Sequence, residues 1–295
     1  MTTQLSYLDR FKGCLRLDPA TEGDVTRELQ AHLEDKSQEL RESGLPEEEV
    51  TGLAAQLLGS PRLIARQMYE VYSQGNWRQA LFAALPHLLI AALFALHCWQ
   101  SVTWVAGTLI AIIGVVIYGW CHSKPVWLFP WLGYCLMPVI AVGILLIYLP
   151  GGWTWFAAAA YTPLAIIVLA LLTKQIIKKD WLFASLMLLP VPIVLSWILT
   201  LGTGEKLPWY EHLYVTAPWI ALSFTVLATG VAIFIRIRQR WAKAGALLTL
   251  EILVLAIVAS ATENAIDFRI WLLLILLSLF LFLGPALIEH RIRES

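Results

Sequence analysis

The chain changes its hydrophobic pattern about a quarter of the way along. In the first part, apolar residues recur at three- and four-residue steps between charged and polar ones, as Leu5, Leu8, Phe11 and Leu15 do. This spacing predicts short amphipathic helices that bury one apolar stripe and expose the opposite face to water. Further on, apolar residues run almost unbroken for about 20 residues at a time, the length of a membrane span. The pattern therefore divides the chain into a soluble head, residues 1–75, and a membrane region, residues 76–295.

Four helices are predicted in the head. The first two cover about residues 3–16 and 20–43, and the last two begin at Pro46 and Pro61. Proline is favoured in the first turn of a helix, where its missing N–H would have no partner within the helix. The apolar stripes are predicted to form one small shared core that includes Leu29, Leu33, Leu53, Leu57, Ile64 and Met68.

Four short motifs follow one another in the head. They are Tyr7-Leu8, Glu28-Leu29-x-Ala31-His32-Leu33-Glu34, Gly44-Leu45-Pro46-Glu47-Glu48-Glu49-Val50 and Leu58-Gly59-Ser60-Pro61. In order and spacing they resemble the HAAS-type domain, also called the permease prefix domain, which often has aspartate where this chain has Ser60. The resemblance implies a cytoplasmic regulatory or signalling module joined to a permease-like bacterial membrane region, often associated with PadR-type regulators. It implies no catalytic residue.

Eight apolar runs in the membrane region are each long enough to cross a bilayer. They cover residues 80–99, 102–121, 127–149, 153–173, 181–201, 213–235, 244–262 and 270–288. Apolar residues make up 59% of the chain and charged residues 14%, a composition that excludes an ordinary soluble enzyme, a disordered chain and a nucleic-acid binder with a broad basic face. The predicted fold class is all-α, with the four-helix head followed by a bundle of eight transmembrane helices.

Basic residues are distributed unevenly between the loops that join these runs. If the N-terminus is cytoplasmic, ten Lys and Arg residues lie in cytoplasmic loops and only Lys206 and Arg269 lie outside. The ten are Lys124, Lys174, Lys178, Lys179, Arg236, Arg238, Arg240, Lys243, Arg291 and Arg293. The positive-inside rule therefore predicts a multi-pass protein of the bacterial cytoplasmic (inner) membrane with both termini cytoplasmic. No cleavable signal peptide is expected, because the first 30 residues lack an apolar core segment.

Ionisable residues inside a span are the best indicators of function in such a region. Glu251 lies 8 residues past Lys243, and His87 lies 9 residues past Arg78 on a span of the same direction. Both are therefore predicted at about 12 Å from the cytoplasmic end, as a candidate intramembrane polar site on neighbouring helices. The pair would relay protons or bind a cationic group, or it would form only a structural hydrogen bond between helices.

Prolines and repeated sequence motifs leave two questions open. Pro190-Val191-Pro192 is the candidate for a true helix break, although ordinary kinking is an alternative for all the prolines within the spans. Trp127-Leu128-Phe129 reappears as Trp181-Leu182-Phe183 at an offset of 54 residues. This match fits duplicated two-helix hairpins, and it also fits convergence on tryptophan and apolar residues at span ends.

The remaining residues favour no catalytic chemistry. The four cysteines show no CxxC spacing and are expected to be free thiols, and no motif for a metal, a cofactor or catalysis is present. The chain is therefore interpreted as a permease-like or signal-transducing component rather than an enzyme. The alternatives are a small-solute or lipid transporter with the head as its regulator, or an intramembrane lipid-modifying enzyme. The expected partners are the lipid bilayer, a cytosolic protein bound through residues 1–75, and a PadR-type regulator or a transporter subunit, but no nucleic acid.

Overall fold

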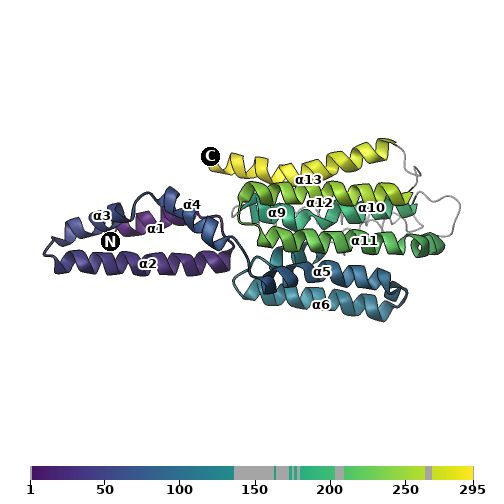
Figure 1. The fold of residues 1–295 in the computed structure, drawn as a ribbon, viewed down its shortest axis with the longest axis horizontal. Coiled ribbons are helices and arrows are strands. Elements are labelled where there is room, and N and C mark those ends of the chain that lie inside the picture. The colour runs from purple at the N-terminus through teal and green to yellow at the C-terminus, as the bar shows by residue number, and fades with distance from the viewer. Residues whose placement is uncertain are drawn as a thin grey trace.

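The computed structural model describes residues 2–135, 163, 173–174, 176–177, 180–202, 209–262 and 268–294. Within these ranges the secondary structure is helical and contains no strand. Figure 1 shows an elongated unit made of the first four helices, which projects from one end of a bundle of longer, roughly parallel helices. The all-α fold class is thus confirmed for the described part of the chain.

The head consists of four helices in residues 2–72. They are α1 (Thr2–Cys14), α2 (Pro19–Glu42), α3 (Glu47–Leu58) and α4 (Pro61–Tyr72). The Asp18 carboxylate caps α2, because it accepts hydrogen bonds from the backbone N–H of Thr21 at 3.3 Å and from its hydroxyl at 2.7 Å. Gly44 and Gly59 end α2 and α3 at positive φ (87° and 94°), a conformation that costs glycine little.

The core of the head differs in one respect from the predicted set. Leu29 and Leu33 of α2 are buried, and Ile64 and Met68 of α4 pack against that core. Helix α3 instead buries Val50 and Ala54 and exposes Leu53 and Leu57, so the prediction that both leucines lie in the core was wrong. The small side chains allow α3 to lie close to its neighbours, which turns the leucines of the same helix toward the outside.

Six helical segments in the described residues are long and apolar enough to cross a membrane. They comprise α5 (Trp77–Ala95), α6 (Val102–Cys121), the continuous α9 (Trp181–Leu188) and α10 (Pro190–Gly202), α11 (Trp209–Arg236), α12 (Arg240–Thr262) and α13 (Phe268–Glu294). A short 3-10 helix, η1 (Cys98–Gln100), joins α5 to α6. Each segment matches one predicted run, as expected of a multi-pass membrane protein.

The other two predicted runs, residues 127–149 and 153–173, lie mostly outside the described residues. Their described start, Leu128 to Cys135, is helical. The total of eight spans therefore stays a prediction.

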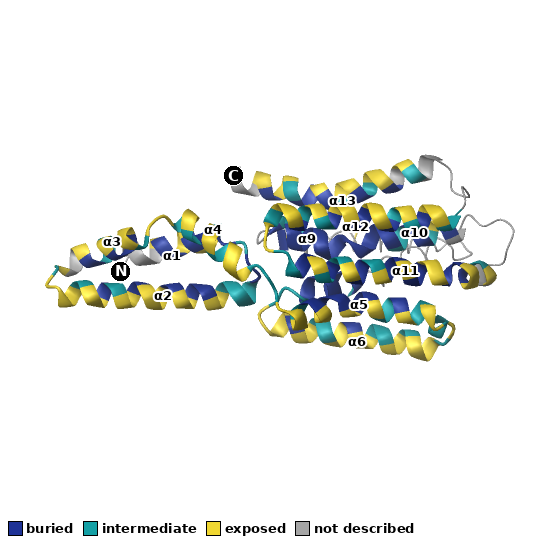
Figure 2. Ribbon diagram, in the orientation of Figure 1, coloured by how far each residue is buried: buried dark blue, intermediate teal, exposed yellow. Residues whose placement is uncertain are grey.

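Residues on the inner side of the bundle are buried, and residues on its outer side are exposed. Figure 2 shows buried residues facing the interior of the bundle, while α6, α12 and α13 carry exposed residues along their outer faces. These outer faces are apolar, as Ile110 on α6, Ile252 on α12 and Phe280 on α13 illustrate. Apolar outer faces of this length are the surfaces that lipid would cover.

The order of the helices in space is set by α11. It packs against α5 on one side and α12 on the other (Figure 1). Gly230 makes the second contact close, because a Cβ at this position would overlap the side chain of Leu250 on α12. Spans 80–99 and 244–262, which were predicted to be neighbours, are instead separated by α11.

The head meets the bundle at the end where α5, α9 and α12 begin and where α11 and α13 finish. The N–H of Gly75 donates to the carbonyl of Ile235 at 2.9 Å, and the N–H of Trp181 donates to the carboxylate of Glu289 at 3.0 Å. The basic loop 236–243 and the C-terminal end of α13 therefore lie at the same end as the head.

Candidate functional site

Four charged residues from four different elements meet where the head joins the bundle. Arg16 lies in the link between α1 and α2, Asp180 precedes α9, Arg240 opens α12 and Glu289 lies near the end of α13. The Asp180 side chain is only 1% exposed, and that of Glu289 is 7% exposed. We call these four residues the junction network.

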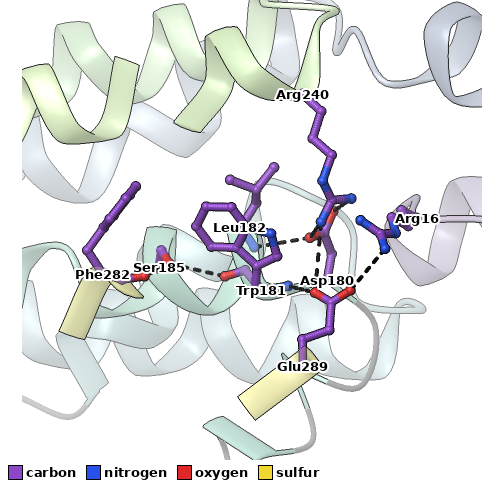
Figure 3. Close-up of polar contacts among 8 residues, drawn as sticks. All are labelled: Arg16, Asp180, Trp181, Leu182, Ser185, Arg240, Phe282 and Glu289. Atoms are coloured by element: carbon purple, nitrogen blue, oxygen red, sulfur yellow. Dashed lines mark hydrogen bonds and ion pairs between the residues drawn. The ribbon is translucent and has the colours of Figure 1, made fainter. Parts of the chain in front are cut away.

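The network is held by short polar contacts (Figure 3). The Arg240 guanidinium donates to both oxygens of Asp180, at 2.7 and 3.0 Å. It also lies 3.8 Å from the carboxylate of Glu289, which in turn is 3.3 Å from the guanidinium of Arg16. Since Arg16 belongs to the head and the other three residues belong to the membrane helices, the network joins the two parts.

Asp180 also has a local structural role. Its backbone is extended (φ −157°, ψ 132°), and its carboxylate accepts the N–H of Leu182 at 3.1 Å, as an N-cap residue does. Burial raises the pKa of Asp180 above its ordinary value, and the Arg240 guanidinium and the bond from Leu182 act in the opposite direction. The carboxylate therefore depends on these partners to stay charged in a buried place.

A second set of contacts ties the end of α4 to the basic loop. The Lys243 ammonium donates to the carbonyl of Ser73 at 2.8 Å, and Arg238 Nε donates to the carbonyl of Glu70 at 3.0 Å. The Ser73 hydroxyl donates in return to the carbonyl of Arg238 at 2.9 Å. Cations at the C-terminal end of a helix also stabilise its dipole. Basic residues that predicted the topology thus hold the head in place as well.

The predicted intramembrane pair is not formed. Glu251 is 4% exposed and faces a cavity of about 10 Å³ lined by residues of α9 and α13 as well as by Leu189. Ser278 lies near its carboxyl group, although the serine hydroxyl makes no hydrogen bond of standard geometry. The prediction that His87 lies opposite Glu251 was wrong.

His87 has different neighbours. It is fully buried, and its ring meets that of Tyr134 edge-on at 5.2 Å between centroids. Neither ring nitrogen forms a hydrogen bond with a described residue. The imidazole therefore packs as an aromatic ring in this part of the bundle.

The chain is irregular at the predicted break. Helix α9 ends at Leu188 and α10 begins at Pro190, while Leu189 between them keeps a helical backbone (φ −50°, ψ −43°). The ring of Pro192 follows one turn later, and its carbonyl accepts the Ser196 hydroxyl at 2.7 Å. The interruption is thus confined to one residue, and the two pieces stay in line.

The two similar Trp-Leu-Phe motifs lie side by side. The rings of Phe129 and Phe183 stack at 4.6 Å between centroids with an interplanar angle of 6°. Both motifs open their helices near the head, because Trp127 packs edge-on against Phe82 in the first two turns of α5. This neighbourhood is what paired hairpins would give.

The described residues supply no set of metal ligands. No group of three or more His, Cys, Asp or Glu side chains within the described ranges could hold a metal ion. The cysteines Cys14, Cys98, Cys121 and Cys135, all described, are free thiols. The junction network is therefore the main polar cluster from which a function can be argued.

The junction network was not predicted from the sequence, because its acids stand among the basic residues that mark the loops. Asp180 directly follows Lys178 and Lys179, and Glu289 stands in a tail with Arg291 and Arg293. A buried acid at the end of an apolar span is costly without a partner, so each acid was a signal for a buried ion pair.

Comparison of the chain with family models, with curated proteins and with solved structures finds no match.

Proposed function

We propose that this chain is a signal-transducing protein of the bacterial inner membrane, whose head reports the arrangement of the membrane helices to a cytosolic partner. The observation that carries the proposal is the junction network. Arg16 of the head shares Glu289 with Arg240, and Arg240 holds Asp180. A shift of α9, α12 or α13 at this end would change the position of a charged partner of the head.

The orientation in the membrane follows from the same end of the bundle. Arg236, Arg238, Arg240 and Lys243 are joined to the head or to its link with α5 by hydrogen bonds or through the junction network. The positive-inside rule would place this basic end in the cytoplasm. The head and the end of α13 would then both be cytoplasmic.

The packing around Glu251 favours signalling over transport. A single water molecule needs a cavity of roughly 10–15 Å³, and the cavity beside Glu251 measures about 10 Å³. Among the described residues, this cavity leaves no room for a solute beside the carboxyl group. The packing of the described residues around Glu251 therefore favours a bundle whose helices move as units over a bundle that contains a substrate pathway.

The outer surface of the head suits a protein partner. Leu57 and Leu63, on either side of the turn between α3 and α4, are 57% and 58% exposed. Leu53 adds to this apolar surface on α3. The resemblance to the permease prefix domain supports a cytosolic regulator of the PadR type or a transporter subunit as the partner.

Hydrogen–deuterium exchange tests the proposed coupling. The purified chain would be placed in nanodiscs of lipids with shorter and longer acyl chains, and exchange would be measured in α1 and α4. We expect the exchange to depend on bilayer thickness, because a change of tilt in α13 displaces Glu289 from Arg16. Glu289→Gln should remove most of this dependence.

The control is Arg27→Gln, since Arg27 lies on the exposed face of α2, away from the junction network, and pairs with Asp24. This variant should keep the response of the wild-type protein. Hydrogen–deuterium exchange in α1 and α4 that is the same in all bilayers would contradict the coupling. Reporter fusions after Gln100 and after Lys124 test the topology separately and should report opposite sides of the membrane.

A further inference from the structure

A groove of about 570 Å³ lies between the head and the loop that joins α11 to α12. Arg62, Arg66 and Glu70 of α4 form one wall, and the segment from Arg238 to Trp241 forms the other. Sites for small ligands commonly measure about 300–1,000 Å³. The groove therefore has room for a polar group the size of a lipid headgroup.

The groove is strongly basic. Five arginines line it, and Glu70 is the one acid among the described residues that do. Two of the arginines, Arg16 and Arg240, already pair with Glu289 and Asp180. Of the other three arginines, Arg66 lies 3.7 Å from the carboxylate of Glu70. Among the described residues that line the groove, about two positive charges are left without a counter-charge, so the groove attracts an anion.

The groove opens at the level where lipid headgroups are expected. Trp241, in the first turn of α12, is 86% exposed, and indoles prefer the interface between headgroups and acyl chains. Leu248 and Ile252 lie on the same outward face of α12, seven and eleven residues further on, and both are exposed. An apolar track therefore leads from the mouth of the basic groove along the membrane helix.

We infer that this groove binds the phosphate-bearing headgroup of an anionic phospholipid, with the acyl chains lying along the Trp241–Ile252 face of α12. Arginine suits this role, because its planar guanidinium donates paired hydrogen bonds to phosphate oxygens. Basic pockets at the cytoplasmic ends of membrane helices are a known means of recognising such lipids. A bound headgroup would bridge the head and the bundle, since each contributes one wall.

Tyr69 supplies a further donor at the floor of the groove. Its hydroxyl makes no hydrogen bond within the described part of the chain, and burial raises its pKa to about 12. The phenol carries its proton at neutral pH, so it can donate a hydrogen bond to a phosphate oxygen. The inference depends on the chain crossing a membrane and not on its proposed signalling role.

Lipid binding to the purified full-length chain in detergent tests this inference. Native mass spectrometry would compare phosphatidylglycerol with phosphatidylcholine, which carry the same acyl chains and differ in net charge. We expect the wild-type protein to bind phosphatidylglycerol at least about tenfold more tightly, and Arg62→Gln with Arg66→Gln to lose about tenfold in that affinity. Both arginines are exposed, so the substitutions leave the core of the head intact.

The matched control removes two positive charges from α2, outside the groove, through Arg27→Gln and Lys36→Gln. It should bind phosphatidylglycerol as the wild-type protein does. Equal binding of the two lipids to the wild-type protein would overturn the inference, whatever the variants do. So would equal losses in the groove variant and the control, which would indicate a general charge effect. Competition by free glycerol phosphate at the lipid's own concentration would identify a soluble anion as the occupant and would also overturn it.

Discussion

Arg240 and Asp180, which are 60 residues apart in sequence, form a bidentate ion pair with N–O distances of 2.7 and 3.0 Å. The pair fixes the start of α12 against the start of α9. Because Asp180 is buried, its charge has few other means of stabilisation. The pair is therefore a point at which a single substitution should affect the whole bundle.

Asp180→Asn should destabilise the protein by roughly 3 kcal/mol, at the lower end of the cost of breaking a buried ion pair. Asparagine keeps the N-cap bond to Leu182, so the loss reports on the charge and not on the cap. Chemical unfolding in detergent micelles would measure the change.

A double-mutant cycle separates this pair from general damage. Asp180→Asn combined with Arg240→Gln should cost less than the sum of the two single changes, because Arg240→Gln leaves the buried Asp180 carboxylate without its cation and Asp180→Asn leaves Arg240 with only the more distant Glu289. Additive losses would mean that the two residues stabilise the fold independently.

Gly133→Ala should be among the most damaging small substitutions. A Cβ at this position would collide with the carbonyl oxygen of Met187 and would lie 2.8 Å from the ring of Pro190. Neither neighbour can move without shifting the helix, so the expected loss is at least about 1–3 kcal/mol.

Gly114→Ala is the matched control for this substitution. Position 114 of α6 has no atom within 4 Å of an added Cβ, and alanine favours a helix by about 0.5–1 kcal/mol over glycine. Thermal unfolding of both variants in the same detergent should give opposite signs. Equal effects would show that the close approach at Gly133 is not limiting.

Tyr69 should make the head less stable at strongly alkaline pH. Burial raises its pKa from 10.0 to about 12, so the folded protein keeps a proton that the unfolded chain loses. This contribution is complete below pH 10 and falls as the pH rises toward 12, by at most about 1.4 kcal/mol per pH unit.

The measurement is tyrosinate absorbance during a pH titration, taken as the difference between the wild-type protein and Tyr69→Phe. The difference should show a midpoint well above 10, together with a flatter decline of stability in the variant. A midpoint at the ordinary value would place Tyr69 in solvent.

Glu251 should tolerate loss of its charge better than loss of its polarity. Glu251→Gln keeps the shape and the hydrogen-bonding groups beside Ser185 and Ser278. Glu251→Leu removes them, so Ser278 loses its polar neighbour. We expect Glu251→Gln to express and unfold like the wild-type protein, and Glu251→Leu to be less stable. A functional defect in a stable Glu251→Gln protein would instead indicate a proton or cation site.

The local pattern of the sequence was enough to predict the helices. Steps of three and four residues predicted α1 to α4, and unbroken apolar runs predicted the six described segments that can span a membrane. Such predictions succeed because a backbone in lipid must satisfy its own hydrogen bonds, which leaves a long apolar run little choice but a helix. The basic loops likewise predicted which ends of the helices lie on the side of the head.

The sequence could not predict which helices are neighbours. Apolar residues that face lipid and those that face another helix look alike, so no periodicity showed that α11 separates α5 from α12. His87 and Glu251 were matched by depth alone, and depth does not determine the side of the bundle on which a residue lies. Close contacts such as Gly230 against Leu250 decided the order of the helices. That order brought Asp180, Arg240 and Glu289 together from distant parts of the chain, and this long-range packing is what only the tertiary structure could determine.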